Sequence, residues 1–217
     1  MKEKLYTIPV NDAFDHDSEC PLCAMYHSLE TNAIEFTMGP SYMEDDIREA
    51  TSRLGFCDTH LHQLYQNQNR LGLALILKSH MDKLIKETQK LSNSGGKSGG
   101  SFFFKKKDET SGIVSYLNEM EETCFICNKI NDTFERYIAT IFHLYRHEKN
   151  FREKFNLSKG FCTSHYKTLY SSSTLYLHGE ELSNFQMELN KLYLDNMKRV
   201  RDDLEWFINK FDYRYAN

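Results

Sequence analysis

The stretch Gly55-Phe56-Cys57-Asp58-Thr59-His60 recurs later in the chain as Gly160-Phe161-Cys162-Thr163-Ser164-His165. A Cys-x-x-Cys pair precedes each copy: Cys20 and Cys23 before the first, and Cys124 and Cys127 before the second. Together these motifs use all six cysteines of the 217-residue chain. The sequence therefore contains a duplicated set of three cysteines and one histidine.

The spacing within the two sets is nearly equal. Cys23 precedes Cys57 by 34 positions, and Cys127 precedes Cys162 by 35. A lone Cys-x-x-Cys is weak evidence for a metal site, but four ligand residues that occur twice with the same flanking Gly-Phe are much more specific. We therefore expect each Cys-x-x-Cys pair to share a site with the Cys-x-x-His motif that follows it.

Three cysteines and one histidine are a common ligand set for structural zinc, which is held in a tetrahedron. A separation of three residues places Cys57 and His60 on the same face of one helical turn, and a glycine just before each repeat permits close approach of two helix starts. Each metal would then join two helix N-termini. The sequence predicts two zinc ions, with the first held by Cys20, Cys23, Cys57 and His60 and the second by Cys124, Cys127, Cys162 and His165.

Alternatives to a structural zinc follow from the same residues. Thiolate-rich tetrahedral sites also hold iron, and Cys-x-x-Cys is the spacing of thiol oxidoreductases, although the βαβ pattern that accompanies those motifs is absent here. Four protein ligands leave no position for a water, so catalysis at the metal is not expected. Glu30, Asp58 and Glu135 are the nearest candidates for a general base, and we interpret all three as ordinary helix-surface residues.

The predicted fold is all-α. Only 3 prolines and 10 glycines occur, apolar residues recur at helical spacing, and no segment alternates with the period of two that strands need. We expect two related helical halves, packed as one helical bundle-like domain, each half pinned by a Cys3His site. The halves are residues 1–91 and 113–217, joined by a flexible Gly/Ser/Lys-rich linker over 92–112. The longest helices are predicted over about 22–38, 41–54, 57–91, 130–145 and 180–211.

The linker contains three phenylalanines followed by three lysines, Phe102 to Lys107. We interpret this as a mobile loop, and the alternative is a hook that docks on a membrane surface or a partner. His143 and His147 lie one turn apart on a predicted helix and could bind a metal jointly, but the sequence shows no third ligand beside them. No glycine-rich nucleotide-binding motif is present.

The net charge of −4 and the pI of about 6.1 exclude a strongly basic protein, so no nucleic-acid partner is expected. The N-terminus lacks the apolar run of a signal peptide, and no segment is long enough for a membrane span. A cytoplasmic protein is expected, and in that reducing compartment paired cysteines are metal ligands or redox thiols rather than structural disulfides.

The chain also resembles an uncharacterised bacterial family that is defined as a domain of unknown function. Apart from the two Cys/His repeats, the resemblance rests on the segments Tyr6–Phe14, Ser18–Cys23, Asn69–Leu75 and Asp203–Arg214. It covers nearly the whole chain outside residues 92–112. The resemblance implies the same fold and sites and adds no activity.

Taken together, the sequence favours a non-enzymatic zinc protein with a binding or scaffold role. The alternative is a thiol or metal-redox protein in which one of the Cys-x-x-Cys pairs cycles. A third hypothesis is a helical domain that binds a ligand in the aromatic core between the halves. The sequence identifies no specific partner, although a protein partner is compatible with it.

Overall fold

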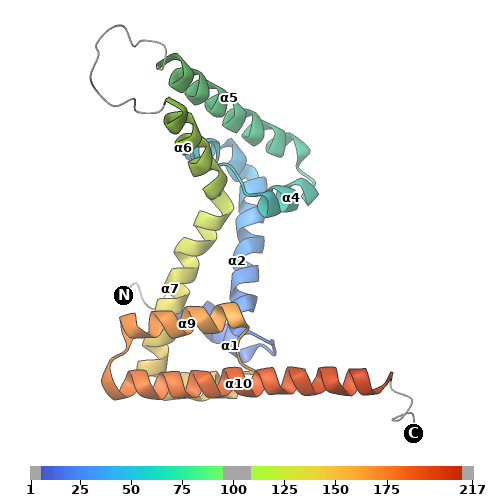
Figure 1. Ribbon diagram of the computed structural model, residues 1–217, viewed down its shortest axis with the longest axis vertical. Coiled ribbons are helices and arrows are strands. Elements are labelled where there is room, and N and C mark those ends of the chain that lie inside the picture. The colour runs from blue at the N-terminus through green and yellow to red at the C-terminus, as the bar shows by residue number, and fades with distance from the viewer. Residues whose placement is uncertain (1–5, 95–108, 212–217) are drawn as a thin grey trace. The chain divides into compact units, whose positions relative to one another are not determined.

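The computed structural model describes residues 6–94 and 109–211, and in these ranges it contains helices and no strand (Figure 1). The all-α prediction is confirmed. The α-helices are α1 (Thr7–Asp15), α2 (Pro21–Met38), α3 (Asp45–Leu54), α4 (Asp58–Gln66), α5 (Arg70–Ser94), α6 (Glu109–Glu122), α7 (Phe125–His147), α8 (Lys149–Leu157), α9 (Thr163–Tyr176) and α10 (Gly179–Asn209), with a short 3-10 helix at Pro40–Met43.

Residue contacts divide the chain into two compact units. Unit 1 comprises Met1–Leu29 and Asp132–Asn217, and unit 2 comprises Glu30–Asn131. Both boundaries fall inside helices, one in α2 and the other in α7. The units therefore do not coincide with the sequence halves 1–91 and 113–217, because unit 2 lies in sequence between the two segments of unit 1.

Unit 1 has an aromatic core. In this unit α1 packs against α8. The helices α9 and α10 also pack against each other (Figure 1). Phe155 is fully buried, and its ring centroid lies 5.4 Å from those of both Phe161 and Phe185. Burying a phenylalanine side chain contributes about 1.5–3 kcal/mol. Phe161 is the residue before Cys162, so this packing fixes the start of the second Cys-x-x-His motif.

Unit 2 is built around α5, which packs against α3, α4 and α6. The expectation of one helix over about 57–91 is wrong, because α4 ends at Gln66 and α5 begins at Arg70. Asn69 accounts for the new start, since its side-chain Oδ1 accepts a hydrogen bond from the N–H of Gly72 at 2.9 Å, as an N-cap residue does. A Cβ at position 72 would lie 2.5 Å from that same side chain, which explains the glycine.

Both ends of the segment 92–112, which the sequence predicts to be a linker, are helical. Residues 92–94 belong to α5, and residues 109–112 belong to α6. The segment from Phe102 to Lys107 lies outside the described residues. None of the helices over 6–94 and 109–211 combines the length and apolar character needed to cross a membrane.

Candidate metal centres

All four ligand motifs lie at helix N-termini, as the sequence predicts. Cys20 directly precedes α2, and Cys124 directly precedes α7, so the second cysteine of each pair falls in the first helical turn. Cys57 is the N-cap residue of α4, and Cys162 is the N-cap residue of α9. Helix N-termini favour the thiolate form of cysteine because the amide dipoles point their positive ends toward it.

In unit 1 the residues Cys20, Cys23, Cys162 and His165 form one cluster, with all four ligand atoms within 4.8 Å of one another. The Nδ1 atom of His165 lies 3.5, 3.2 and 3.2 Å from the sulfurs of Cys20, Cys23 and Cys162, respectively. The sulfurs of Cys23 and Cys162 are 3.6 Å apart.

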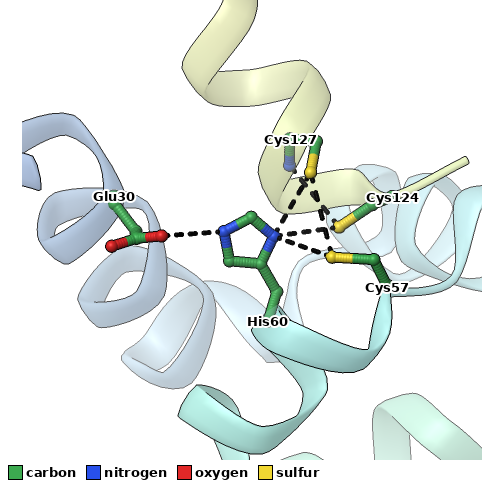
Figure 2. A network of polar contacts seen from close by, with 5 residues as sticks. All are labelled: Glu30, Cys57, His60, Cys124 and Cys127. Carbon is green, nitrogen blue, oxygen red and sulfur yellow. Dashed lines mark hydrogen bonds and ion pairs between the residues drawn. The ribbon is translucent and has the colours of Figure 1, made fainter. Parts of the chain in front are cut away.

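In unit 2 the residues Cys57, His60, Cys124 and Cys127 form the second cluster (Figure 2). His60 Nδ1 lies 3.2, 3.4 and 3.3 Å from the sulfurs of Cys57, Cys124 and Cys127, respectively. The sulfurs of Cys57 and Cys127 are 3.9 Å apart. The two clusters thus have the same composition and the same histidine nitrogen facing three sulfurs.

The prediction that each Cys-x-x-Cys pair shares a site with the Cys-x-x-His motif that follows it is wrong. Cys20 and Cys23 combine with the second motif, and Cys124 and Cys127 combine with the first. The pairing is crossed because the start of α7 lies against the segment before α4. The N–H of Phe125 donates a hydrogen bond to the carbonyl oxygen of Gly55 at 2.9 Å. The hydroxyl of Thr123 donates one to the carbonyl oxygen of Leu54 at 2.8 Å. Each compact unit still contains one Cys3His group.

The distances in both clusters fit a tetrahedral metal ion. Zinc with Zn–S bonds of about 2.3 Å and a Zn–N bond of about 2.0–2.1 Å requires sulfur–sulfur separations of about 3.8 Å and sulfur–nitrogen separations of about 3.5 Å. The observed separations of 3.6 and 3.9 Å between sulfurs and of 3.2–3.5 Å between sulfur and nitrogen lie within a few tenths of an ångström of these values. They are far longer than a disulfide bond of about 2.0 Å, and all six cysteines are free.

The glycine before each Cys-x-x-His motif has a positive φ, +59° at Gly55 and +119° at Gly160. A Cβ at position 55 would lie 2.7 Å from the imidazole ring of His80, and one at position 160 would lie 3.0 Å from the carbonyl oxygen of Leu192. Both backbone conformation and space therefore require glycine. The sequence predicts that these glycines let two helix starts approach each other, but the atoms that crowd them belong to the interiors of α5 and α10.

Glu30 extends the unit 2 cluster. Its Oε1 lies 3.2 Å from Nε2 of His60, the ring nitrogen that faces away from the sulfurs (Figure 2). The interpretation of Glu30 as an ordinary surface residue is wrong, and no signal in the sequence joins it to a histidine 30 positions later. A carboxylate in this position holds the ring of a ligating histidine and raises its basicity. Asp58 and Glu135 are exposed, as expected.

The two clusters differ in their access to solvent. In unit 2, His60 and Cys124 are both 3% exposed. In unit 1, Cys23 is exposed, and its neighbours Cys20 and Cys162 line the same surface cavity of about 500 Å³. Cys23 is therefore the cluster cysteine that reagents in solution reach most easily.

The thiols in the clusters resist ionisation unless a cation balances them. Two effects raise the pKa of Cys23 to about 12: the larger is the loss of water around the thiol, and the smaller is the neighbouring Cys20. Burial and the neighbouring Cys124 raise the pKa of Cys127 to about 12 in the same way. Burial lowers the pKa of His165, which keeps its ring neutral. A divalent cation would supply the charge that three adjacent thiolates need.

The two clusters are the only groups of this kind among residues 6–94 and 109–211: no third group of three or more metal-ligating side chains occurs there. His143 and His147 have their ring centroids 4.7 Å apart on α7, but no third ligand joins them within this part of the chain.

No curated protein and no solved structure matches the chain in sequence or structure comparisons. A family model does match, and it covers residues 1–217. The features that carry the sequence resemblance, above all the two Cys/His repeats, are the features that the fold assembles into two clusters. The chain belongs to this family, which is described as a family of unknown function (DUF6062).

Proposed function

We propose that the protein binds two zinc ions, one in each unit, and that each ion is a structural cross-link between two helix N-termini in a non-enzymatic binding or scaffold protein. The observation that carries this proposal is the pair of clusters in which one histidine nitrogen and three sulfurs lie within 4.8 Å of one another. Three thiolates and an imidazole form a closed structural zinc set.

A structural role is supported by the absence of room for substrate chemistry. Four protein ligands complete a tetrahedron, so no position remains for a reactive water. Glu30, the one carboxylate that contacts a cluster histidine in the described part of the chain, faces its outer nitrogen and not the sulfurs. We place the protein in the cytoplasm, because free cysteines gathered into metal-type sets are typical of a reducing compartment.

The direct test is the metal content of protein purified without added metal, measured by elemental mass spectrometry. We expect two zinc ions per chain, and one in each of the single variants His60→Ala and His165→Ala. Two equivalents of iron would replace zinc in the proposal. No metal in the wild-type protein, with six reactive thiols, would overturn it.

A second candidate function is specific to unit 1, where Cys23 is exposed and three cysteines line an open cavity. A peroxide would take one electron from each of two thiolates, forming a Cys20–Cys23 sulfur–sulfur bond and, with two protons, two waters. The site would lose two of its four ligands, and α2 would separate from α9. This would make the unit 1 cluster a redox-responsive cross-link, while the more buried unit 2 cluster would remain intact.

This candidate is tested by adding hydrogen peroxide to the metal-loaded protein in the presence of a chromophoric chelator. If the unit 1 cluster is a redox-responsive cross-link, it releases one equivalent of metal rapidly, and a thiol reductant restores the site. His60→Ala, which retains only the unit 1 site, should release its metal at the same rate. Equal, slow release from both sites would leave the purely structural role.

A further inference from the structure

A cavity of about 470 Å³ lies in unit 1 on a face of α7 that neither metal cluster uses. Small-molecule sites commonly have volumes of about 300–1,000 Å³. The lining comes mainly from residues of α7 at steps of three and four, which share one face of the helix. Tyr6 and Tyr176 from outside this helix complete the lining.

One part of the cavity wall is aromatic. The rings of Phe142 and Tyr176 are stacked, with centroids 5.0 Å apart and planes inclined by 14°. Phe142 is 1% exposed and belongs to the core, whereas Tyr176 is 38% exposed and presents its ring at the cavity. A fixed aromatic side chain of this kind offers a stacking surface to a flat apolar group.

The rest of the wall is rich in cationic and hydrogen-bond donating groups. Two arginines and two histidines line the cavity, and no carboxylate is among its described lining residues. Arg136 lies ten residues before Arg146, or about 15 Å along the helix axis, and its Nη1 already donates a hydrogen bond to the hydroxyl of Tyr6 at 3.0 Å. His143, Arg146 and His147, in contrast, share one helical turn.

The guanidinium of Arg146 is available to a ligand at little cost. Its Nε lies 3.2 Å from Oε2 of Glu181, and the two side chains are 48% and 49% exposed. Exposed ion pairs of this kind contribute about 0–1 kcal/mol. A carboxylate or phosphate that binds in the cavity can use the remaining donors of the planar guanidinium, which suit such groups in a bidentate geometry.

We propose that this cavity binds a small organic anion with a flat apolar body, whose carboxylate or phosphate group contacts His143, Arg146 and His147. The apolar body stacks on Tyr176 and covers the helix face toward Thr140. The site is independent of the proposed zinc role, because none of its lining residues belongs to a cluster.

The test uses the metal-loaded full-length protein and the aromatic anion 1-anilinonaphthalene-8-sulfonate as a fluorescent probe. We expect saturable binding at one site per chain. The double variant His143→Gln/Arg146→Gln should bind the probe at least about tenfold more weakly, which corresponds to about 1.4 kcal/mol. Far-UV circular dichroism and metal content should remain those of the wild type, because both positions lie outside the clusters.

Arg201→Gln is the matched control. Arg201 is an exposed arginine of unit 1 on α10, close in sequence to the exposed apolar residues Leu204 and Trp206. The probe should bind this variant as it binds the wild type. Equal weakening in both variants, or equal binding by the wild type and the double variant, would overturn the proposal. Arg146 would then serve only as a cation that balances the C-terminal dipole of α7.

Competition distinguishes the head group of the natural ligand. Displacement of the probe by benzoate assigns a carboxylate, and displacement by phenyl phosphate assigns a phosphate; both results support the site. Failure of both aromatic anions to displace the probe would overturn it. A result at this cavity does not depend on which metal occupies the clusters.

Discussion

Glu30 and His60 form a carboxylate–imidazole pair behind the unit 2 cluster, with Oε1 of Glu30 3.2 Å from Nε2 of His60. The opposite ring nitrogen faces three sulfurs, so Nε2 carries the proton when Nδ1 binds a metal and donates it to the carboxylate. The two side chains are 16% and 4% exposed, respectively, so solvent screens the contact only partly. His165 in unit 1 has no such carboxylate among its contacts with described residues, and its ring packs instead against Phe134 at 5.5 Å.

Glu30→Gln should therefore weaken metal binding in unit 2 alone. Loss of such an outer partner typically costs about 10–100-fold in metal affinity. In a competition titration with a chromophoric chelator, the phase that belongs to the unit 2 site should shift and the other phase should stay. Glu35→Gln changes an exposed carboxylate on the same helix and serves as the control. A shift of both phases would contradict the assignment.

The crossed pairing makes a prediction about double variants. Cys20→Ser combined with Cys162→Ser removes two ligands of the same cluster, so the protein should retain one zinc. Cys20→Ser combined with Cys57→Ser removes one ligand from each cluster and should abolish both sites. Pairing between neighbouring motifs would give the opposite result. Elemental analysis of the two purified variants decides between these arrangements.

Gly55→Ala should destabilise unit 2. The residue has a φ of +59°, and a Cβ there would lie 2.7 Å from the imidazole ring of His80, so the substitution meets both backbone strain and a steric clash. We expect a loss of about 1–3 kcal/mol, measured as a lower midpoint of thermal unfolding. Gly112→Ala is the matched control: it lies in α6 with no atom within 4 Å of the added Cβ, so it should leave stability unchanged or slightly raised.

Glu188 connects α10 to α7 and α8 in unit 1. Its carboxylate accepts hydrogen bonds from the hydroxyl of Tyr145 at 2.7 Å and the amide of Asn156 at 3.0 Å, and it pairs with Arg152. Although burial opposes ionisation, these partners lower the pKa of Glu188 below its usual value. Glu188→Gln should reduce the free energy of unfolding by about 1–3 kcal/mol at neutral pH.

The wild type and Glu188→Gln also test how the free energy of unfolding depends on pH. A carboxyl group with a lowered pKa in the folded state stabilises the fold above its unfolded pKa, about 4.5 here, and that stabilisation is lost as the pH falls through its folded value. The stability gap between the wild type and Glu188→Gln should thus be constant above pH 5 and shrink in acid. Glu205→Gln, an exposed substitution on the same helix, is the control and should change the free energy of unfolding at neutral pH by no more than about 0.5 kcal/mol.

The sequence was sufficient to predict the helical class and the eight residues that gather in the two clusters, but it was not sufficient to predict which motifs share a cluster. The duplicated Cys-x-x-Cys and Cys-x-x-His motifs have nearly identical spacing, so each pair is equally compatible with either partner by spacing alone. The choice depends on tertiary contacts such as the hydrogen bond from Phe125 to Gly55. Pro21, at the equivalent position in the first pair, has no N–H to donate, so that contact is not repeated in unit 1.

Local polar chemistry limited the prediction in a different way. Asn69 divides a continuous apolar pattern into α4 and α5, because its side chain satisfies the N–H of Gly72 at the new helix start. Glu30 lies on an amphipathic helix where a glutamate is expected to face solvent, and only the path of α4 brings His60 to it. Both features depend on a side chain that meets a partner, which hydrophobic periodicity does not record.

The crossed ligands also form nested loops in the chain. The unit 2 cluster is complete once Cys127 has been synthesised, and Cys57 and Cys127 are 70 residues apart. The unit 1 cluster joins Cys20 to His165 across 145 residues, which include all of unit 2. Because chains emerge from the ribosome N-terminus first, the unit 2 cluster can assemble before Cys162 and His165, the partners of Cys20 and Cys23, have been synthesised. A chain whose first 131 residues have emerged from the ribosome would thus have a complete unit 2 cluster, while the unit 1 cluster would still lack Cys162 and His165.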